Sequence, residues 1–198
     1  MAVQADANGT LPLPGATVAL DPDWMAGDAG WALFEALRAG LPWERHRITV
    51  YGRTIDAPRL SCWIGEVAYK YSGTVFAPHP WPDSLVPVRA RLERELGARF
   101  NSVLANLYRD GADRLGYHSD SEPELGPAPL IASVSLGATR RFRFRGRGGD
   151  ASLGIDLTHG SLLVMSGATQ RAYVHAVPPT ARPTGPRINL TFRHVRPR

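Results

Sequence analysis

From Phe100 to the end of the chain, polar and apolar residues alternate with a period of two, in short runs separated by glycine-containing turns. Turn signals such as Asp110-Gly111, Gly137 and Gly148-Gly149 stand between the runs. The runs are SVLANLY, LIASVSL, RRFRFR, SLGIDL, SLLVMS, AYVHAV and RINLTFR. Evenly spaced short strands of this kind are typical of a β-sandwich or barrel, of which the jelly roll is one form. We therefore expect a fold that is mostly β with some α-helix.

Two helices are predicted ahead of these strands, where they would cover one face of the sheet. Asp28 can cap the first, which ends at Gly40 and has an apolar face made of Trp31, Phe34 and Leu37. The second has a proline in its first turn, Gly97 after its end, and the apolar stripe Leu85, Val88, Leu92 and Leu96. The chain before about Leu20 is rich in glycine and proline, and we expect a loosely ordered leader there.

Length and composition exclude several classes of protein. The 198 residues suffice for one domain with a substantial core. No apolar run approaches the roughly 18 residues of a membrane span, so we expect no membrane association. The N-terminus lacks the basic region and apolar block of a secretory signal, and Cys62 has no second cysteine with which to form a disulfide. We therefore expect a cytoplasmic protein, or a nuclear one if the source is eukaryotic.

The formal net charge is +5, and it is distributed unevenly. The stretch before Arg45 is acidic, whereas arginines cluster between 140 and 147 and again from 182 to 198. Such asymmetry is typical of a protein that turns one face to a polyanion. Because Lys70 is the only lysine, a genome that prefers arginine codons would explain the arginines equally well.

A candidate metal site begins with His118 and Asp120 in the segment GYHSD. In an extended chain, two side chains at this spacing point to the same side. One more imidazole would complete the two-histidine, one-carboxylate set of a non-haem Fe(II) site. The candidates for it are His46, His79, His159, His175 and His194. His175 lies in the strand-like run AYVHAV, where a histidine satisfied within the core is the alternative interpretation.

The run RINLTFR places four polar residues on one face of a strand: Arg187, Asn189, Thr191 and Arg193. Two arginines that face the interior of a sheet are destabilising unless an anion meets them. A dicarboxylate would satisfy both through bidentate hydrogen bonds. Asn106 and Tyr108 in ANLYRDG similarly place an amide and a phenol on one face. A solvated strand face is the alternative for both segments.

Together these motifs resemble those of the AlkB family of alkylation-repair dioxygenases. The resemblance extends from about Asn101 to Arg193 and includes the run IASVSLG ahead of Arg141 and Phe142. It implies a double-stranded β-helix (jelly-roll) core with the N-terminal helices packed on one face. It also implies Fe(II) bound by the catalytic residues His118, Asp120 and His175, with 2-oxoglutarate and O2 as cosubstrates. The implied 2-oxoglutarate residues are Asn106, Tyr108, Arg187, Asn189, Thr191 and Arg193, with Arg187 at the distal carboxylate.

Farther upstream, the chain resembles the family members that repair double-stranded DNA. The segment ITVYGR is similar to a hairpin whose tip, here Tyr51 with Gly52 and Arg53, fills the gap left by an extruded base. The segment YKYSG implies a base sandwich made by Tyr69 and Tyr71. Glu122 is placed to accept hydrogen bonds from the exocyclic amine of the base, and Ser121 replaces a second acid of those relatives. Tyr51 stands where the subgroup more usually has phenylalanine.

The resemblance also implies a division of the chain and a function. Residues 1–20 would be the leader and 21–198 a single dioxygenase domain, with helices and nucleotide-recognition hairpins over about 21–99 and the jelly roll over 100–198. The implied reaction is oxidative demethylation of bases of the 1-methyladenine and 3-methylcytosine type in DNA, releasing formaldehyde, succinate and CO2. The alternatives are the same chemistry on RNA or protein, and a non-catalytic basic nucleic-acid-binding protein. We expect a monomer that binds alkylated nucleic acid.

Overall fold

The computed structural model describes residues 6, 9–25, 27–50, 52–71, 74–149 and 151–196. For residues 48–50, 53, 69–71 and 74–76 it describes the backbone alone. None of the helices in this part of the chain is both long enough and apolar enough to cross a bilayer.

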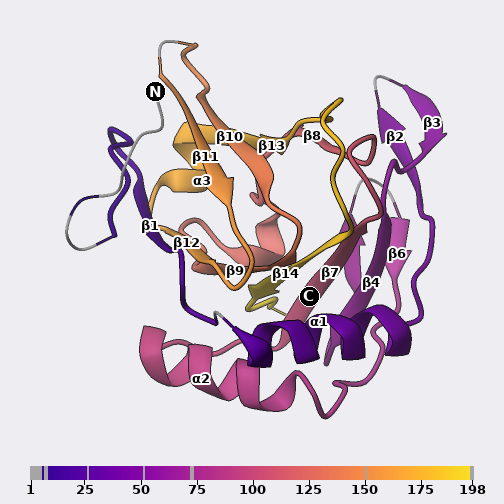
Figure 1. The fold of residues 1–198 in the computed structure, drawn as a ribbon. Coiled ribbons are helices and arrows are strands. Elements are labelled where there is room, and N and C mark those ends of the chain that lie inside the picture. The colour runs from indigo at the N-terminus through magenta and orange to yellow at the C-terminus, as the bar shows by residue number, and fades with distance from the viewer. Residues whose placement is uncertain are drawn as a thin grey trace.

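Two antiparallel sheets form the centre of the molecule (Figure 1). The six-stranded sheet has the order β1 (Thr17–Asp21), β12 (Leu162–Ser166), β9 (Ile131–Gly137), β14 (Arg187–Arg193), β7 (Ser102–Tyr108) and β4 (Leu60–Gly65). The four-stranded sheet has the order β11 (Ser152–Leu157), β10 (Arg140–Gly146), β13 (Tyr173–Val177) and β8 (Leu115–His118). This architecture confirms the expected jelly roll, and every run named in the sequence coincides with a strand to within one residue.

Within the described residues, two hairpins and four helical segments complete the fold. The hairpins pair β2 (Arg47–Val50) with β3 (Arg53–Asp56), and β5 (Tyr69–Tyr71) with β6 (Thr74–Phe76). The helical segments are α1 (Asp28–Gly40), α2 (Val86–Leu96), the short α3 (Thr169–Ala172) and a 3-10 turn at Pro123–Leu125. Both long helices lie on one side of the six-stranded sheet (Figure 1), as the sequence predicted.

The boundaries and faces of the long helices follow from their sequences, with two corrections. Gly97 ends α2 in a left-handed conformation at φ 59°, which glycine adopts without steric strain. Asp28 is the first residue of α1 and does not cap it, because Gly27 occupies the cap position. Trp31 is 47% exposed and not part of the buried face; it stacks on His159 at 4.1 Å between ring centroids. Gly30, Leu33, Phe34 and Leu37 form that face instead.

Strand β14 separates two environments and thereby positions the polar residues of the sheet. Its apolar residues belong to a buried cluster shared with the long helices, and they are Ile188, Leu190 and Phe192. Its polar residues alternate with them and therefore lie on the opposite face, toward the four-stranded sheet. A second apolar cluster, which includes Ile131, Phe144 and Leu163, fills part of the space between the sheets. All seven residues of β14 are buried, so its arginines are interior groups.

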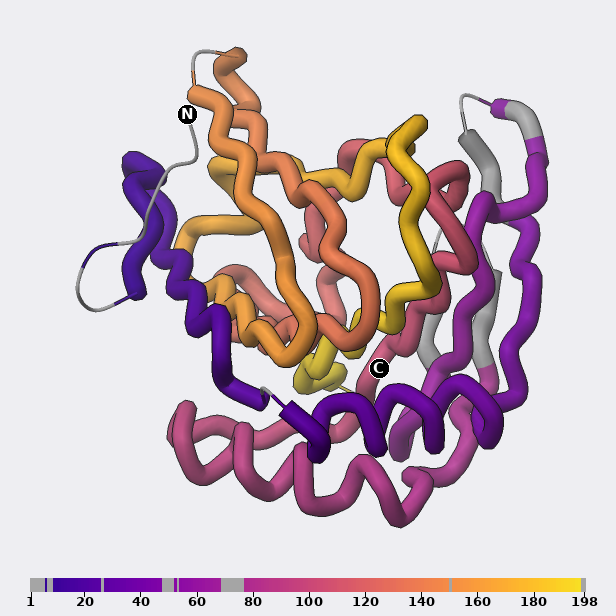
Figure 2. The backbone as a smooth tube through the Cα atoms, in the orientation of Figure 1, coloured from indigo at the N-terminus to yellow at the C-terminus, as the bar shows by residue number. Residues whose placement is uncertain are grey.

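The N-terminal segment is better ordered than its composition indicated. Strand β1 pairs with β12 along its whole length (Figure 2), and Leu11, Leu13 and Val18 are buried in the second cluster. The expectation of a loosely ordered leader is therefore wrong for residues 9–20. Glycine and proline correctly indicated turns, but the pattern within 1–20 could not reveal the open edge of β12, to which this segment binds.

Candidate metal and cosubstrate site

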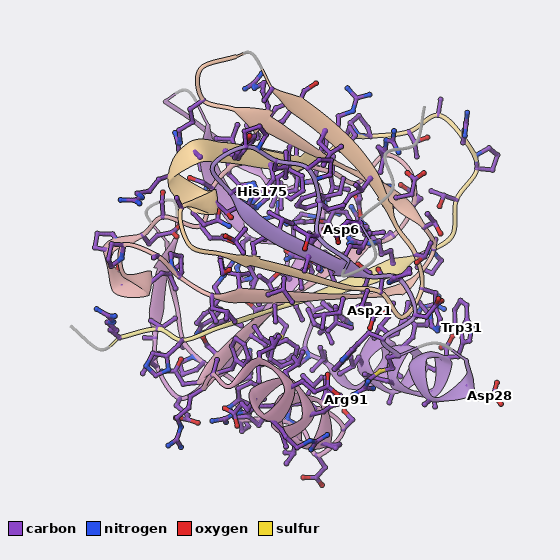
Figure 3. All side chains as sticks on the ribbon, turned by 90° about the vertical axis from the view of Figure 1, so that its left-hand side faces the viewer. Asp6, Asp21, Asp28, Trp31, Arg91 and His175 are labelled. Atoms are coloured by element: carbon purple, nitrogen blue, oxygen red, sulfur yellow. The ribbon has the colours of Figure 1, made fainter. Side chains whose placement is uncertain are left out.

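Two residues from neighbouring strands and one from the loop that follows form the candidate metal centre. His118 ends β8 and lies directly opposite His175 of β13, and Asp120 follows two residues after β8. The potential ligand atoms of these three side chains all lie within 4.8 Å of one another. Figure 3 shows His175 well separated from the long helices, which carry Asp28, Trp31 and Arg91.

His175 is thus the histidine that joins His118 and Asp120; among the described residues no other set of this kind occurs. His159, one of the alternatives, has a structural role. Its Nδ1 accepts a hydrogen bond from the backbone N–H of Gly137 at 2.9 Å.

Hydrogen bonds orient two of the three candidate ligands. The Nδ1 of His118 lies 2.9 Å from the carbonyl oxygen of Gly116, to which it donates, and this leaves Nε2 available for a metal. The Nη2 of Arg193 donates to Oδ1 of Asp120 at 2.6 Å, and both side chains are buried. The backbone N–H of Asp120 donates to Oε1 of Gln170 at 2.9 Å. Gln170 lies on α3, which therefore supports the loop that carries Asp120.

The electrostatic environment favours the protonation states that bind a metal. Burial lowers the pKa of His118, and burial together with the nearby His118 lowers the pKa of His175 to about 3. Both imidazoles are therefore neutral near pH 7. For Asp120, burial is the largest single effect and opposes ionisation, but the charge and hydrogen bond of Arg193 together with the nearby His175 and His118 outweigh it and lower the pKa of the carboxyl group. A carboxylate beside two neutral imidazoles is the donor set that suits Fe(II).

The polar face of β14 meets the polar face of β7 in register. Arg187 pairs with Tyr108, and Asn189 pairs with Asn106. Arg187 is 1% exposed, and its Nη2 donates to Oγ of Ser135 at 2.9 Å. Its Nε and Nη1, together with the Tyr108 hydroxyl, are buried without a hydrogen-bond partner among the described residues. Burial lowers the pKa of Arg187 to about 10, so the group remains cationic at neutral pH. A buried cation with two unused donors fits an anionic cosubstrate.

Eight of the nine residues predicted to bind the metal or 2-oxoglutarate line one cavity between the sheets: Asn106, Tyr108, His118, Asp120, His175, Asn189, Thr191 and Arg193. Arg187 lies next to Tyr108, beyond the residues that line this cavity. Asn189 donates to Oγ of Ser133 at 2.8 Å and accepts a hydrogen bond from Thr191 at 3.2 Å. These two side chains therefore already have partners within the protein.

Sequence reasoning missed one charged residue of this cavity. Arg59 is 5% exposed, lines the cavity and donates from Nε to Oδ1 of Asn106 at 2.7 Å. It precedes β4 in the segment APRL, and a single arginine between a loop and a strand ordinarily indicates an exposed position. Because Oδ1 of Asn106 accepts this hydrogen bond, the amide N–H groups of Asn106 point away from Arg59.

The predicted substrate residues lie on two hairpins and one loop. Gly52 occupies the turn between β2 and β3 with φ 76°, and Arg53 begins β3; Tyr51 lies outside the described residues. Tyr69 and Tyr71 occupy alternate positions of β5, and for both the structure describes the backbone only. Their roles remain predictions.

Ser121 and Glu122 directly follow the candidate ligand Asp120. The Oγ of Ser121 lies 3.0 Å from that of Ser119. Glu122 is half-buried and precedes the 3-10 turn. Their roles in substrate binding also remain predictions.

Comparison with known proteins identifies the family. Residues 17–193 match the model of the 2OG-Fe(II) oxygenase superfamily. The human protein named alpha-ketoglutarate-dependent dioxygenase alkB homolog 3 is 42% identical over 86% of this chain and 63% of its own length. The human protein named DNA oxidative demethylase ALKBH2 is 39% identical over 75% of this chain and 61% of its own length. The chain belongs to the AlkB family of this superfamily.

Other relatives agree with this placement. The Arabidopsis thaliana protein named DNA oxidative demethylase ALKBH2 is 37% identical over 83% of this chain and 62% of its own length. The AlkB-family chain thus spans between 61 and 63% of the length of these three relatives. A solved structure of OsALKBH1 superposes with a TM-score of 0.64 over 91% of this chain and 98% of that one, at 18% identity, which shows the shared fold. Fe(II) and 2-oxoglutarate, expected from the resemblance, are confirmed as the cofactors of the family.

Proposed function

We propose that this chain is an Fe(II)- and 2-oxoglutarate-dependent dioxygenase that demethylates N-alkylated bases of the 1-methyladenine and 3-methylcytosine type in DNA. The products would be formaldehyde, succinate and CO2. One observation carries the proposal: the ligand atoms of His118, Asp120 and His175 lie within 4.8 Å of one another, in a cavity that Arg193 also lines. Relatives named as dioxygenases and DNA oxidative demethylases favour DNA as the substrate.

Each group of residues has a separate task in this reaction. His118, Asp120 and His175 would hold the iron and leave the remaining coordination positions open. Arg187, with Tyr108 beside it, would take the distal carboxylate of 2-oxoglutarate, and Arg193 the other carboxylate. Asn106 would also contact the cosubstrate. Bound Fe(II) and 2-oxoglutarate would supply the oxidation of the methyl group by O2. Arg193 also holds one oxygen of Asp120 and thereby fixes the orientation of that carboxylate.

The hairpins and the loop after Asp120 would recognise the base. A methyl group on the base-pairing edge cannot be reached inside a duplex, so the nucleotide must be extruded. Tyr51 at the tip of the hairpin, with Gly52 and Arg53, would fill the gap in the stack. Tyr69 and Tyr71 would stack on the extruded base, and cation–π attraction would favour the positively charged lesion by about 1 kcal/mol or more. Glu122 would accept hydrogen bonds from the exocyclic amine of the base.

Two alternatives are less well supported. A non-catalytic nucleic-acid-binding protein has no use for a buried arginine with two unused donors, so Arg187 argues against it. The same chemistry on RNA shares every residue named above, and only a comparison of substrates separates it from DNA demethylation. We further propose that the protein acts as a monomer, in the cytoplasm or in a eukaryotic nucleus.

The test supplies the purified protein with Fe(II), ascorbate and 2-oxoglutarate. Oligonucleotides that carry 1-methyladenine or 3-methylcytosine are offered as single-stranded DNA, duplex DNA and RNA, with a methylated peptide as a further arm. Mass spectrometry follows loss of the methyl group, and formaldehyde and succinate are measured in parallel. We expect demethylation of DNA with equal amounts of the two products. Demethylation of RNA or peptide alone would overturn the DNA assignment, and the absence of succinate with every substrate would overturn the enzymatic one.

A further inference from the structure

Arginine occupies each outward position of strand β10. The inward residues Phe142 and Phe144 are buried, and Arg141, Arg143 and Arg145 alternate with them along the strand. Phe144 lies directly opposite His175 of β13, and residues directly opposite each other in an antiparallel pair point to the same face. The arginine row therefore lies on the outer face of the four-stranded sheet, and the candidate metal site lies on its inner face.

A basic cleft lies at the beginning of this row, between β10 and the segment that joins β13 to β14. Arg141, Arg143 and Arg182 line it together with the threonines at 139, 180 and 184. Asp156, which also lines the cleft, forms an ion pair with Arg141 at 3.1 Å. Within the described residues, neither Arg143 nor Arg182 is ion-paired with a carboxylate, and both are exposed. The cleft therefore has a net positive charge and hydroxyl donors, which suit an anion.

The other end of the row reaches the edge of the metal site. Arg145 lies over the ring of Tyr117, with 4.0 Å between Cζ and the ring centroid, and Tyr117 is 42% exposed. Arg147 comes two residues later, and its Nη2 donates to Oγ of Ser119 at 2.7 Å. Ser119 stands between the two candidate ligands His118 and Asp120. At about 3.4 Å per residue, the distance from Arg141 to Arg147 is about 20 Å.

We propose that this row is a track for the phosphate backbone of the nucleic-acid strand whose base enters the metal site. The inference rests on the proposed function and adds the surface that holds the rest of the polymer. A strand of DNA carries one negative charge per about 3.4 Å of its axis, so a row of this length meets several phosphates. Guanidinium groups bind phosphate through paired hydrogen bonds, and the exposed Arg145 guanidinium that lies over the Tyr117 ring offers a cationic platform on which a base can stack. An acidic peptide would match the charge but would have no bases for this platform.

The test removes two positive charges from the track and compares this variant with one that lacks two exposed arginines elsewhere. The variant Arg143→Gln/Arg182→Gln removes two exposed charges from the track. The control Arg94→Gln/Arg99→Gln removes two exposed charges at the end of α2, on the far side of the six-stranded sheet (Figure 1). Fluorescence anisotropy measures the binding of a labelled, unmethylated single-stranded oligonucleotide at increasing KCl concentration. We expect the slope of log K against log salt to fall by about 0.7 for each arginine removed from the track, and the control to keep the wild-type slope.

Two outcomes would overturn the track. One is a wild-type slope in the track variant; the other is competition by polyglutamate as strong as that by DNA, which would assign the surface to an acidic protein. Turnover separates this inference from the proposed function. With a methylated oligonucleotide long enough to cover the row, the KM of the track variant should rise several-fold at low salt, and with a trinucleotide it should rise less. If the wild-type protein demethylates the oligonucleotide but the track variant keeps the wild-type salt slope, the track is refuted and the proposed function stands. If the track variant has a reduced salt slope but the wild-type protein demethylates nothing, the proposed function is refuted and the track stands.

Discussion

Arg193 and Asp120 form a buried ion pair, with 2.6 Å between Nη2 and Oδ1. The two residues are 73 positions apart in the sequence, and each belongs to a different part of the proposed site. Because Arg193 occupies one oxygen of the carboxylate, the other oxygen would be the one left to bind a metal. The same arginine is predicted to meet 2-oxoglutarate, so the orientation of a metal ligand and the capture of the cosubstrate depend on one side chain.

The first prediction concerns the metal set. His118→Ala, Asp120→Ala and His175→Ala should each abolish turnover and weaken Fe(II) binding, measured by anaerobic calorimetry. His159→Ala is the control, because this histidine hydrogen-bonds Gly137 and stacks on Trp31. The control should lose some thermal stability but bind iron as the wild type does. Undiminished turnover in His175→Ala would remove this residue from the metal centre.

The second prediction concerns Arg187. In the absence of 2-oxoglutarate its charge is buried and incompletely compensated, so Arg187→Met should not lower the free energy of unfolding of the cosubstrate-free protein. The loss of a buried charged partner costs about 2–5 kcal/mol, so the KM for 2-oxoglutarate should rise at least about 30-fold. Thermal stabilisation by added 2-oxoglutarate should disappear as well. Arg182→Met, an exposed control, should leave both measurements unchanged. If Arg187→Met had the KM of the wild type, the arginine would not bind a carboxylate.

The third prediction concerns acid stability. Burial of Asp113 opposes its ionisation, but hydrogen bonds from the side chain and backbone of Arg109 outweigh this effect and lower the pKa of the carboxyl group. A group whose pKa is lower in the folded state stabilises the fold above its unfolded pKa, about 3.9, and loses that contribution as the pH falls through the folded value. Asp113→Asn should therefore be less stable than the wild type at pH 7. The difference should shrink below about pH 4, as measured by urea unfolding across this range. A difference that did not change with pH would show that the ion pair is not the cause.

The fourth prediction concerns Tyr51 and the form of the DNA. Insertion into the gap left by an extruded base recovers stacking worth about 1–3 kcal/mol. Tyr51→Ala should therefore slow repair of duplex DNA by between several-fold and about 100-fold. Repair of the same lesion in a short single strand, which has no such gap, should change little. Tyr69→Ala, predicted to affect the base pocket itself, should slow both. Equal losses on both substrates for Tyr51→Ala would contradict its insertion into the duplex.

Local patterns predicted the elements whose residues alternate strictly. Strand β14 could be predicted to the residue because Ile188, Leu190 and Phe192 separate the four polar residues of the other face. The same alternation placed Asn106 and Tyr108 on one side of β7. Strand β8 was not predicted, because LGYH is short and only partly buried. The segment LSCWIG of β4 was also missed, since its continuous burial leaves no alternation to detect.

Contacts between distant segments could not be predicted from these patterns. Nothing near Arg59 indicates that it will be buried against Asn106, 47 residues later. The choice of His175 as the third ligand depended on the family resemblance, because spacing alone left five histidines as candidates. Gln170 reaches the backbone of Asp120 through a helix of four residues, which is too short to produce a periodic pattern.

Strand β1 has a consequence for how the chain can be shortened. It covers the outer edge of β12, and residues 9–11 fold back over β1 through the hydrogen bonds from Leu20 to Gly9 and from Leu11 to Val18. An uncovered strand edge presents unpaired N–H and C=O groups that pair readily with another molecule. A protein that began at residue 21, the expected start of the domain, would expose the edge of β12 and with it the buried cluster that contains Val18. Such a protein should self-associate through this edge and aggregate, so we expect residues 9–20 to protect the molecule from association with copies of itself.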